Sequence, residues 1–302
     1  MISEFQNSKR LKILILLFAG LLVIDLFLIG YFFVFNHQGQ SSNLNNFVGK
    51  VIFLDVGQGD AILIQTAAQQ NILIDGGPTR QIIYKLDQYL PLNHRQIDLM
   101  ILTHPDPDHL NGLVEVLKHY PVNQVYSNGV SDPDLNYLAW QKIIADKHIP
   151  LHFVIHPEKL QIDQQMRLDF LWPQESLVGQ NLKDDNLGSI VAELVDNNYK
   201  FLFTGDIPAA IENQLIKDNP DFKIDVLKVS HHGSKYSTSL SFLENIKPRY
   251  AVISVGSNKF GHPSVRVLHN LEKLHIPVLR TDQQGDIMFF SDGQNLSLKT
   301  TK

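Results

Sequence analysis

Residues 103–112 of this chain read THPDPDHLNG, so two imidazoles and two carboxylates stand within six positions. The apolar run at residues 97–102 precedes them and predicts a buried strand, and we expect the four side chains to emerge together where it ends. His and Asp are ligands that borderline divalent metals such as zinc accept, and these four groups would repel and desolvate one another without a cation between them. The stretch therefore predicts a metal-binding loop; the alternative is a polar turn that caps the following helix.

The composition fits a folded protein without thiol chemistry. The chain has 302 residues and is 44% hydrophobic, enough for one large domain or two small ones. Its formal net charge of −5 gives no general attraction to nucleic acid, so a polyanion would have to meet a local patch or bound metals. The absence of cysteine excludes disulfides, thiolate-bound zinc and a cysteine nucleophile. Metal ligands must come from His, Asp, Glu or Asn.

The N-terminal part predicts a membrane anchor. Residues 13–35 form an apolar run of 23 residues interrupted only by Asp25, long enough to cross a bilayer as a helix. Basic residues in the short tail at residues 1–12 precede the run and no comparable cluster follows it, which predicts a cytoplasmic tail and a single-pass protein with its remainder outside the membrane. A cleaved signal peptide is the alternative, but the run is long for one. Residues 36–47 predict a polar tether to a domain at residues 48–302.

Beyond the tether, strand and helix patterns alternate in two successive halves. The first half predicts strands at residues 50–56, 61–66, 71–74, 97–102, 122–126 and 151–155, and helices at 81–90, 110–119 and 135–147. The second half begins again with strands at 166–172, 189–195 and 199–204, and continues with helices at 209–217, 240–246 and 265–274 and strands at 224–229, 250–255, 278–280 and 286–290. This order predicts an α+β fold of two mixed sheets packed face to face with helices outside, a four-layer αββα sandwich.

Two further polar clusters follow strands of the second half. Residues 204–206 read TGD, where Gly205 allows close backbone approach and Asp206 places a carboxylate at the sheet edge. Residues 231–234 read HHGS and follow another predicted strand. Ligands at strand ends can converge on one rim, and two metals about 3.5 to 4 Å apart need a bridging carboxylate such as Asp206. In isolation Asp206 would be interpreted as a cap, whereas at least one of the two histidines is expected to be a ligand, with a hydrogen-bonded core histidine as the alternative.

Together these motifs resemble the metallo-β-lactamase superfamily, and more narrowly the metallo-β-lactamase-like domain of ComEC-type DNA-uptake (competence) proteins. The resemblance spans about residues 50–290. Its other landmarks are DVGQGDA at residues 55–61, IDGG at 74–77 and NKFGHPS at 258–264. Several motifs in a fixed order are much more specific than any one of them.

The resemblance implies the αββα fold and a dinuclear metal centre. In this centre His104 and Asp106 would serve the first metal, Asp108 and His109 the second, Asp206 would bridge them, and one of His231 and His232 would complete the second site. The sequence does not decide which member of that last pair is the ligand.

The chain departs from the superfamily's commonest pattern at the first metal. Asp106 stands where a second His is usual. Asp185, Asn186 and Ser189 occupy the stretch before residue 205 where a further His would be expected. Zinc is the first expectation for the two divalent ions. The first site is richer in oxygen, and this makes manganese the alternative.

The implied chemistry is metal-assisted hydrolysis. A water held between the ions would lose a proton near neutral pH, and this metal-bound hydroxide would attack a phosphorus or carbonyl centre. Asp108 would orient the hydroxide as well as bind metal, and His262 would donate to the leaving oxygen, with a helix-cap partner as its alternative role. Ser234 and Lys235 would bind a phosphate oxygen, the alternative being a plain turn. Three further carboxylates are predicted to brace loops: Asp55, Asp60 and Asp75.

The leading hypothesis is thus a membrane-anchored, outward-facing phosphodiesterase, a nuclease acting on DNA or its fragments. An acidic domain is unfavourable for a nuclease, so a hydrolase of a small phosphodiester or of a cell-envelope ester is the alternative enzyme. The non-enzymatic alternative is a binding module whose metal site is degenerate. A β-lactamase is disfavoured because no sequence feature indicates lactam recognition.

Overall fold

The computed structural model describes residues 49–302. The predicted tail (residues 1–12), anchor (13–35) and tether (36–47) lie outside the described residues. Among residues 49–302, no helix combines the length and the apolar character that a membrane span requires.

The first sheet has the strand order β15-β14-β1-β2-β3-β4-β5-β6. Its strands from β15 to β3 pair antiparallel, and those from β3 to β6 pair parallel. The strand bounds are β1 (Gly49–Phe53), β2 (Ile62–Thr66), β3 (Asn71–Ile74), β4 (Leu99–Leu102), β5 (Val125–Ser127), β6 (Leu151–Phe153), β14 (Ile287–Ser291) and β15 (Leu296–Thr300).

The second sheet has the order β13-β12-β11-β10-β9-β8-β7. Strands β10 to β13 pair parallel, and β7 to β10 pair antiparallel. The strand bounds are β7 (Glu158–Gln161), β8 (Met166–Trp172), β9 (Val191–Asp196), β10 (Tyr199–Phe203), β11 (Val226–Lys228), β12 (Tyr250–Ile253) and β13 (Val278–Arg280).

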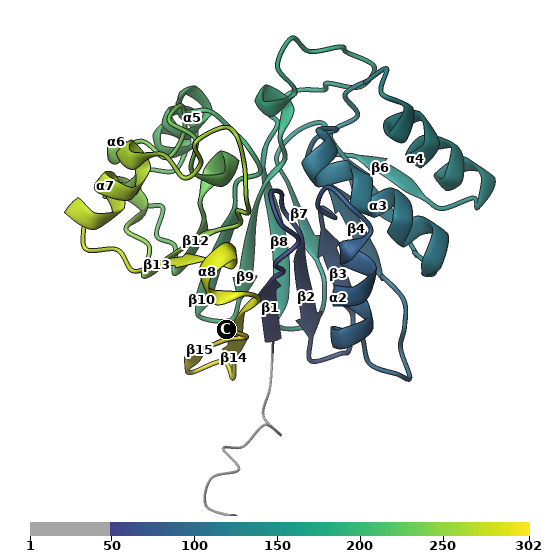
Figure 1. Cartoon of the computed structure of the whole chain (residues 1–302), viewed down its shortest axis with the longest axis horizontal. Helices are drawn as coiled ribbons and strands as arrows, with labels where there is room; N and C mark the ends of the chain where they lie inside the picture. Colours follow the sequence, from purple (N-terminus) through teal and green to yellow (C-terminus); the bar gives the residue numbers. More distant parts are fainter. Residues whose placement is uncertain (1–48) are drawn as a thin grey trace, which may run out of the picture. The chain divides into compact units, whose positions relative to one another are not determined.

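Helices cover the outer face of each sheet (Figure 1). On the first sheet these are α2 (Gln81–Tyr89), α3 (Pro107–His119) and α4 (Leu135–Asp146). On the second they are α5 (Ala209–Asp218), α6 (Leu240–Ile246) and α7 (Val265–Lys273). Three short helices complete the described elements: η2 (Asp185–Gly188), η3 (Ser230–Gly233) and α8 (Thr281–Gln284).

Three apolar layers hold these elements together. Between the sheets, Phe289 packs edge-on against Phe53 and Phe201, with ring centroids 6.1 and 5.8 Å apart. A second layer lies under the helices of the first sheet and contains Trp140, and a third lies under those of the second sheet and contains Phe242. The order is helix, sheet, sheet, helix, so the predicted αββα sandwich is confirmed for the described residues.

The prediction missed two edge strands and shortened one helix. Strands β7 and β15 lie at sheet edges and are mostly polar and exposed, so they lack the apolar run by which buried strands are found. Helix α3 begins at Pro107, a favoured first helical residue because it needs no N–H partner, and not at residue 110. Asp108 and His109 therefore lie in the first helical turn and not in the loop, which corrects the expectation that all four ligand candidates are loop residues.

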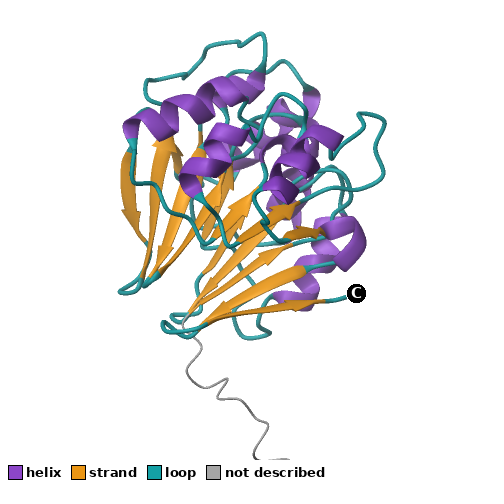
Figure 2. Ribbon diagram, turned by 90° about the vertical axis from the view of Figure 1, so that its left-hand side faces the viewer, coloured by secondary structure: helices purple, strands orange, loops and turns teal. Residues whose placement is uncertain are grey.

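The polar clusters follow strands whose carboxyl ends face one rim. Strands β10, β11 and β12 are parallel neighbours, and β4 occupies the parallel part of the other sheet. Figure 2 shows short turns at one end of the sheets and longer loops at the other. This topology is what brings distant polar segments together.

Candidate metal centre

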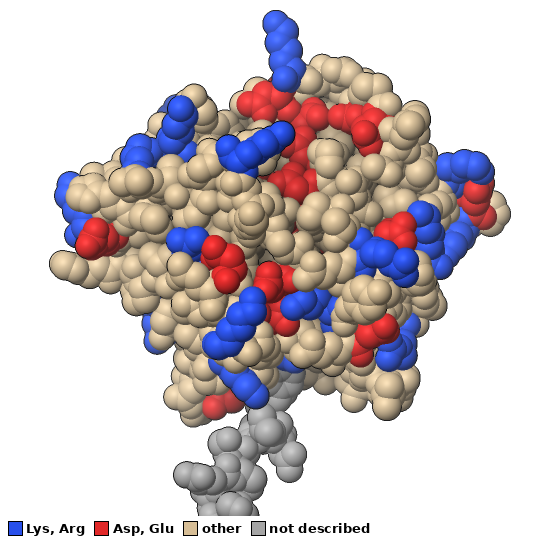
Figure 3. Space-filling view, viewed as in Figure 1, with Lys and Arg blue, Asp and Glu red and all other residues tan. Residues whose placement is uncertain are grey.

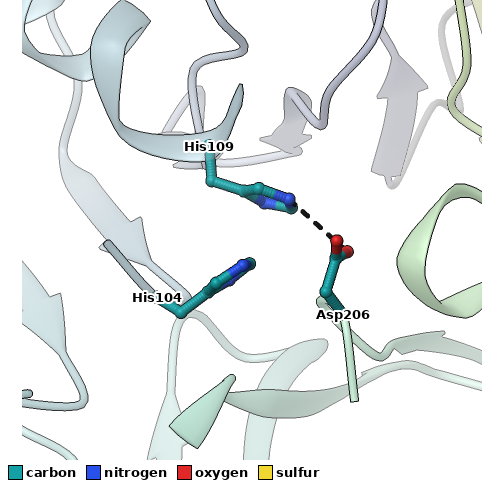
Figure 4. A group of neighbouring side chains, drawn as sticks. All are labelled: His104, His109 and Asp206. Atoms are coloured by element: carbon teal, nitrogen blue, oxygen red, sulfur yellow. Dashed lines mark ion pairs between the residues drawn. The ribbon is translucent and has the colours of Figure 1, made fainter. Parts of the chain in front are cut away.

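Three buried side chains from distant segments meet at this rim (Figure 4). His104 follows β4, His109 lies in the first turn of α3, and Asp206 follows β10. One ligand atom from each lies within 4.8 Å of the others, and His109 Nε2 is 3.4 Å from Asp206 Oδ1. The rings of His104 and His109 have centroids 4.2 Å apart. The two halves of the chain thus contribute to one cluster.

A second group shares His109 and adds His232 and Asp108. The Nε2 atom of His232 lies 3.1 Å from Asp108 Oδ2 and 3.4 Å from Asp206 Oδ2. Its side chain is 1% exposed, whereas that of His231 is 30% exposed and its Nε2 lies 3.8 Å from Asp206 Oδ2. Of the two adjacent histidines, His232 is therefore the better placed ligand.

The backbone explains how two successive histidines differ so much in exposure. Both His231 and His232 have φ of 51°, in the left-handed region that non-glycine residues rarely adopt. Such strained residues cluster at functional sites, where the surrounding structure maintains them. Here the strained turn directs one imidazole into the centre and leaves the other at its edge.

The histidine rings are oriented as metal ligands are. The Nδ1 of His109 donates to Asp75 Oδ2 at 2.8 Å, and that of His232 donates to the Ser254 carbonyl at 2.9 Å. His104 Nδ1 lies 2.9 Å from the hydroxyl of Thr103. Because each Nδ1 has its partner, each ring presents Nε2 to the centre, and a neutral ring holds its lone pair there.

The Nε2 atoms of these three histidines show whether the site fits a metal ion. The Nε2 atoms of His104, His109 and His232 are buried and make no hydrogen bond within residues 49–302, although each has a carboxylate oxygen 3.1–3.6 Å away. A buried polar atom left unpaired costs about 1–3 kcal/mol, so native structures rarely retain three of them in one place. Imidazole nitrogens and carboxylates are the donors that zinc and neighbouring metals accept. The residues present therefore fit divalent metal ions.

The candidate first-site ligand Asp106 lies at the solvent side of this cluster. It is the N-cap residue of α3, yet its side chain makes no capping hydrogen bond, and its Oδ2 lies 3.6 Å from His104 Nε2. The segment where a further His would be expected also lies here: Ser189 accepts a hydrogen bond from Asp206 N at 3.2 Å. Burial and the neighbouring Asp132 raise the pKa of Asp185 to about 6.

Asp75 braces the centre, as the sequence predicted. Its carboxylate accepts hydrogen bonds from the backbone N and the hydroxyl of Thr103, at 2.9 and 2.8 Å, in addition to the one from His109. Asp60 also lies at the centre, with Oδ1 3.5 Å from His232 Nδ1. Asp55, by contrast, forms an ion pair with Lys302.

The sequence interpretation missed Lys228. This lysine ends β11 and is fully buried, and its Nζ contacts Asp60, lies 3.2 Å from Asp206 Oδ1 and donates to the Gly205 carbonyl at 2.7 Å. The signal was present: alternation places Val226 and residue 228 on the same face of β11, and Val226 packs between the sheets. A lysine at a core-facing position needs a buried anion.

Without metal, the centre is a network of paired charges. Burial lowers the pKa of His109, but Asp206 and Asp75 raise it well above its usual value. Burial opposes the charged form of His232 as well, but Asp206 and Asp108 raise its pKa to about 10. Burial disfavours the Asp206 carboxylate, but His232, Lys228 and His109 hold its pKa well below the usual range. A metal would take the place of the imidazole protons.

The predicted substrate-binding residues lie around the edge. His262 is next to His231, with ring centroids 5.3 Å apart; burial and His231 lower its pKa to about 4, so its ring is neutral at pH 7. Ser234 is buried and accepts a hydrogen bond from the Tyr236 backbone N at 3.4 Å. Lys235 is exposed, and in the part of the chain the structure describes no ion pair joins it to the carboxylates of the centre.

The sequence of residues 54–257 matches the family described as the metallo-beta-lactamase superfamily. The chain belongs to this superfamily. ComE operon protein 3 of Bacillus subtilis (strain 168) is 31% identical over 263 residues, which cover 80% of this chain and 33% of that protein. Competence protein ComA of Neisseria gonorrhoeae is 29% identical over 241 residues, which cover 78% of this chain and 31% of that protein.

The chain spans about a third of the length of these curated relatives. The resemblance to ComEC-type competence proteins that the motifs indicated is thereby confirmed. Among solved structures, the metallo hydrolase Igni18 from Ignicoccus hospitalis KIN4/I matches with a TM-score of 0.51 and 14% identity, covering 80% of this chain and 98% of that chain. At this identity the match shows a common fold.

Proposed function

We propose that this metallo-β-lactamase superfamily member is a metal-dependent phosphodiesterase whose substrate is DNA. The observation that carries the proposal is the set of three buried imidazole nitrogens that make no hydrogen bond and lie among the carboxylates of Asp106, Asp108 and Asp206. His104, Asp106 and Asp206 would hold one divalent ion. Asp108, His109 and His232 would hold the other, with Asp206 shared. Zinc is the first expectation for both ions, and manganese is the alternative because Asp106 and Asp206 enrich the first site in oxygen.

Bound divalent ions would supply Lewis acidity toward the phosphodiester and would lower the pKa of water. The protein groups around them have separate tasks. Asp75 and the Ser254 carbonyl fix the rings of His109 and His232, and Lys228 fixes Asp206. His262 is neutral at pH 7 and can donate an N–H hydrogen bond to a leaving oxygen, but it carries no additional proton to transfer.

DNA is the proposed substrate because the chain resembles ComEC-type DNA-uptake (competence) proteins, and one of its relatives is named competence protein ComA. The charge of −5 remains unfavourable for a polyanion, so the bound cations would have to supply much of the attraction. A hydrolase of a small phosphodiester or of a cell-envelope ester would use the same centre. A non-catalytic module would hold one metal or none.

Hydrolysis of single- and double-stranded DNA and of a generic phosphodiester by the purified chain, with added zinc or manganese, separates these functions. We expect metal-dependent cleavage of DNA that Asp206→Asn abolishes with the fold retained. A wild-type protein that binds metal and cleaves only the small diester would favour the alternative enzyme. A folded wild-type protein that cleaves neither would contradict the proposal.

We also propose that residues 13–35 anchor the protein in the cell membrane with residues 48–302 on the extracytoplasmic side. The proposal depends on the apolar run and the basic residues that precede it. Protease added to intact cells should then remove the C-terminal domain. Protection of the domain in intact cells, with digestion after lysis, would contradict the orientation.

A further inference from the structure

Two exposed aromatic side chains belong to segments that border the metal centre. Tyr236 is 67% exposed and Phe260 is 63% exposed, although large aromatic side chains ordinarily bury most of their surface. Tyr236 stands three residues after Gly233, the last residue of the strained histidine turn. Phe260 contacts His262 with ring centroids 5.7 Å apart, and His262 contacts His231 at the edge of the centre. We call Tyr236 and Phe260 the aromatic rim.

The loop that carries Phe260 is held in one conformation by Asn258. The Asn258 side-chain oxygen accepts hydrogen bonds from the backbone N of Phe260 and of His262, both at 3.1 Å. Its amide nitrogen donates to the carbonyls of Gly256 and His262, at 2.9 and 2.8 Å. The exposed phenyl ring is thus presented by a braced loop. A ligand that used this ring would lose little free energy to loop ordering.

Each ring of the aromatic rim has a lysine ammonium over one of its faces, which leaves the opposite face for a base. Lys235 Nζ lies 5.0 Å from the centroid of Tyr236, and Lys259 Nζ lies 5.8 Å from that of Phe260. Both lysines are exposed. An aromatic face with an adjacent ammonium is the combination with which proteins bind single-stranded nucleic acid, because the base stacks on the ring and the phosphate meets the cation.

Near Asp106 the edge of the metal centre carries acidic side chains, whereas the aromatic rim carries lysines. The acidic side chains Asp132 and Asp185 lie near Asp106, and Asp184 adjoins Asp185 in the sequence. Figure 3 shows acidic side chains gathered at the upper edge of that view, with lysine and arginine side chains flanking them. A polyanion entering the centre is therefore repelled by one wall and attracted by the aromatic rim.

We propose that the aromatic rim is a stacking site for the bases of single-stranded nucleic acid, with Lys235 and Lys259 contacting the backbone phosphates. The inference rests on the proposed function, because it names the part of the protein that would hold a nucleic-acid strand as the strand enters the metal centre. A duplex offers no free base faces, so it would use only the lysines. The site would thus distinguish single strands from duplexes of equal charge.

Binding of a short labelled oligothymidylate with nuclease-resistant phosphorothioate linkages to the metal-loaded full chain, measured by fluorescence anisotropy, tests the site. The comparison strand is an abasic oligonucleotide of equal length and charge. We expect Phe260→Ala and Tyr236→Ala each to weaken oligothymidylate binding about fivefold to tenfold, at the lower end of what one base–aromatic stack contributes. Phe260→Trp should retain binding, because the indole also stacks.

The matched control is Tyr84→Ala. Tyr84 lies on α2 and is also 67% exposed, so its removal changes a similar aromatic surface elsewhere on the protein. This variant should bind oligothymidylate as the wild type does. Lys259→Gln should weaken binding of the oligothymidylate and the abasic strand alike and lower the salt dependence of both by about one unit of slope.

Wild-type binding that is equal for the two strands, or losses in Phe260→Ala that are equal for both, would overturn the stacking site. Preferential binding of anionic vesicles through the aromatic rim, without a base-dependent term, would assign it to a membrane surface and would also overturn the proposal. The proposed function can fail while the stacking site stands. In that case the metal-loaded protein binds oligothymidylate more tightly than the abasic strand but cleaves no phosphodiester.

Discussion

Replacing Lys228 with methionine removes a fully buried ammonium that contacts two buried carboxylates, those of Asp60 and Asp206. Methionine has nearly the same length, so the packing is largely kept while the charge is lost. Removal of one partner from a buried ion pair costs about 3–5 kcal/mol, because the remaining charge is left uncompensated. We therefore expect the metal-free Lys228→Met protein to lose about 3–5 kcal/mol of unfolding free energy.

Divalent metal should reduce this loss. If Asp206 is a metal ligand, bound cations provide the positive charge that the variant lacks. We expect the difference in unfolding free energy between the variant and the wild type to be at least about 1.5 kcal/mol smaller with saturating metal, the lower end of what one hydrogen bond to a charged group contributes. Urea unfolding with a chelator and with saturating manganese or zinc gives both values.

The matched control is Lys200→Met. Lys200 also lies on a strand of the second sheet, but its side chain is 43% exposed and its Nζ lies 2.8 Å from Glu193 Oε1. Such pairs contribute about 0.2–1 kcal/mol, and metal should not alter the effect. A loss in Lys228→Met no larger than in this control, or a loss that is identical with chelator and with metal, would refute the reasoning.

Three further predictions follow from the centre. Asp75→Asn should weaken metal affinity about 10- to 100-fold, because it removes the acceptor that orients His109, and competition with a chromophoric chelator measures this. His232→Ala should lower the metal content of the protein more than His231→Ala, as measured by elemental analysis; equal effects would contradict the placement of the two rings. Because the pKa of His232 is raised from 6.5 to about 10, its charge stabilises the metal-free fold fully below pH 6.5, and this contribution is lost as the pH rises through 10. Metal affinity should instead rise over that window with proton release on binding, which titration calorimetry in buffers of different ionisation enthalpy detects; binding without proton release would contradict it.

The layered fold could be predicted because its buried strands have a clear sequence pattern. Apolar runs such as the one before His104 mark buried strands, and polar clusters at their ends indicate a common rim. Edge strands such as β7 and β15 give no such signal, since half of their surface faces water. Helix α3 was predicted to start late because the polar first turn carries site residues in place of the apolar pattern.

The site was predictable in its residue types but not in its orientation. No sequence pattern distinguishes His231 from His232, because their different exposure follows from left-handed backbone at both positions. Lys228 was overlooked because a lysine at the end of an apolar strand is ordinarily a solvated residue. Only the packing of the two sheets shows that its ammonium reaches Asp60 and Asp206.

Anomalous diffraction from crystals of the protein soaked in manganese tests the central claim most directly. We expect two peaks about 3.5–4 Å apart, with Asp206 between them and the Nε2 atoms of His104, His109 and His232 as ligands. A well-ordered centre that shows no peak, or a single ion bound away from Asp206, would contradict it.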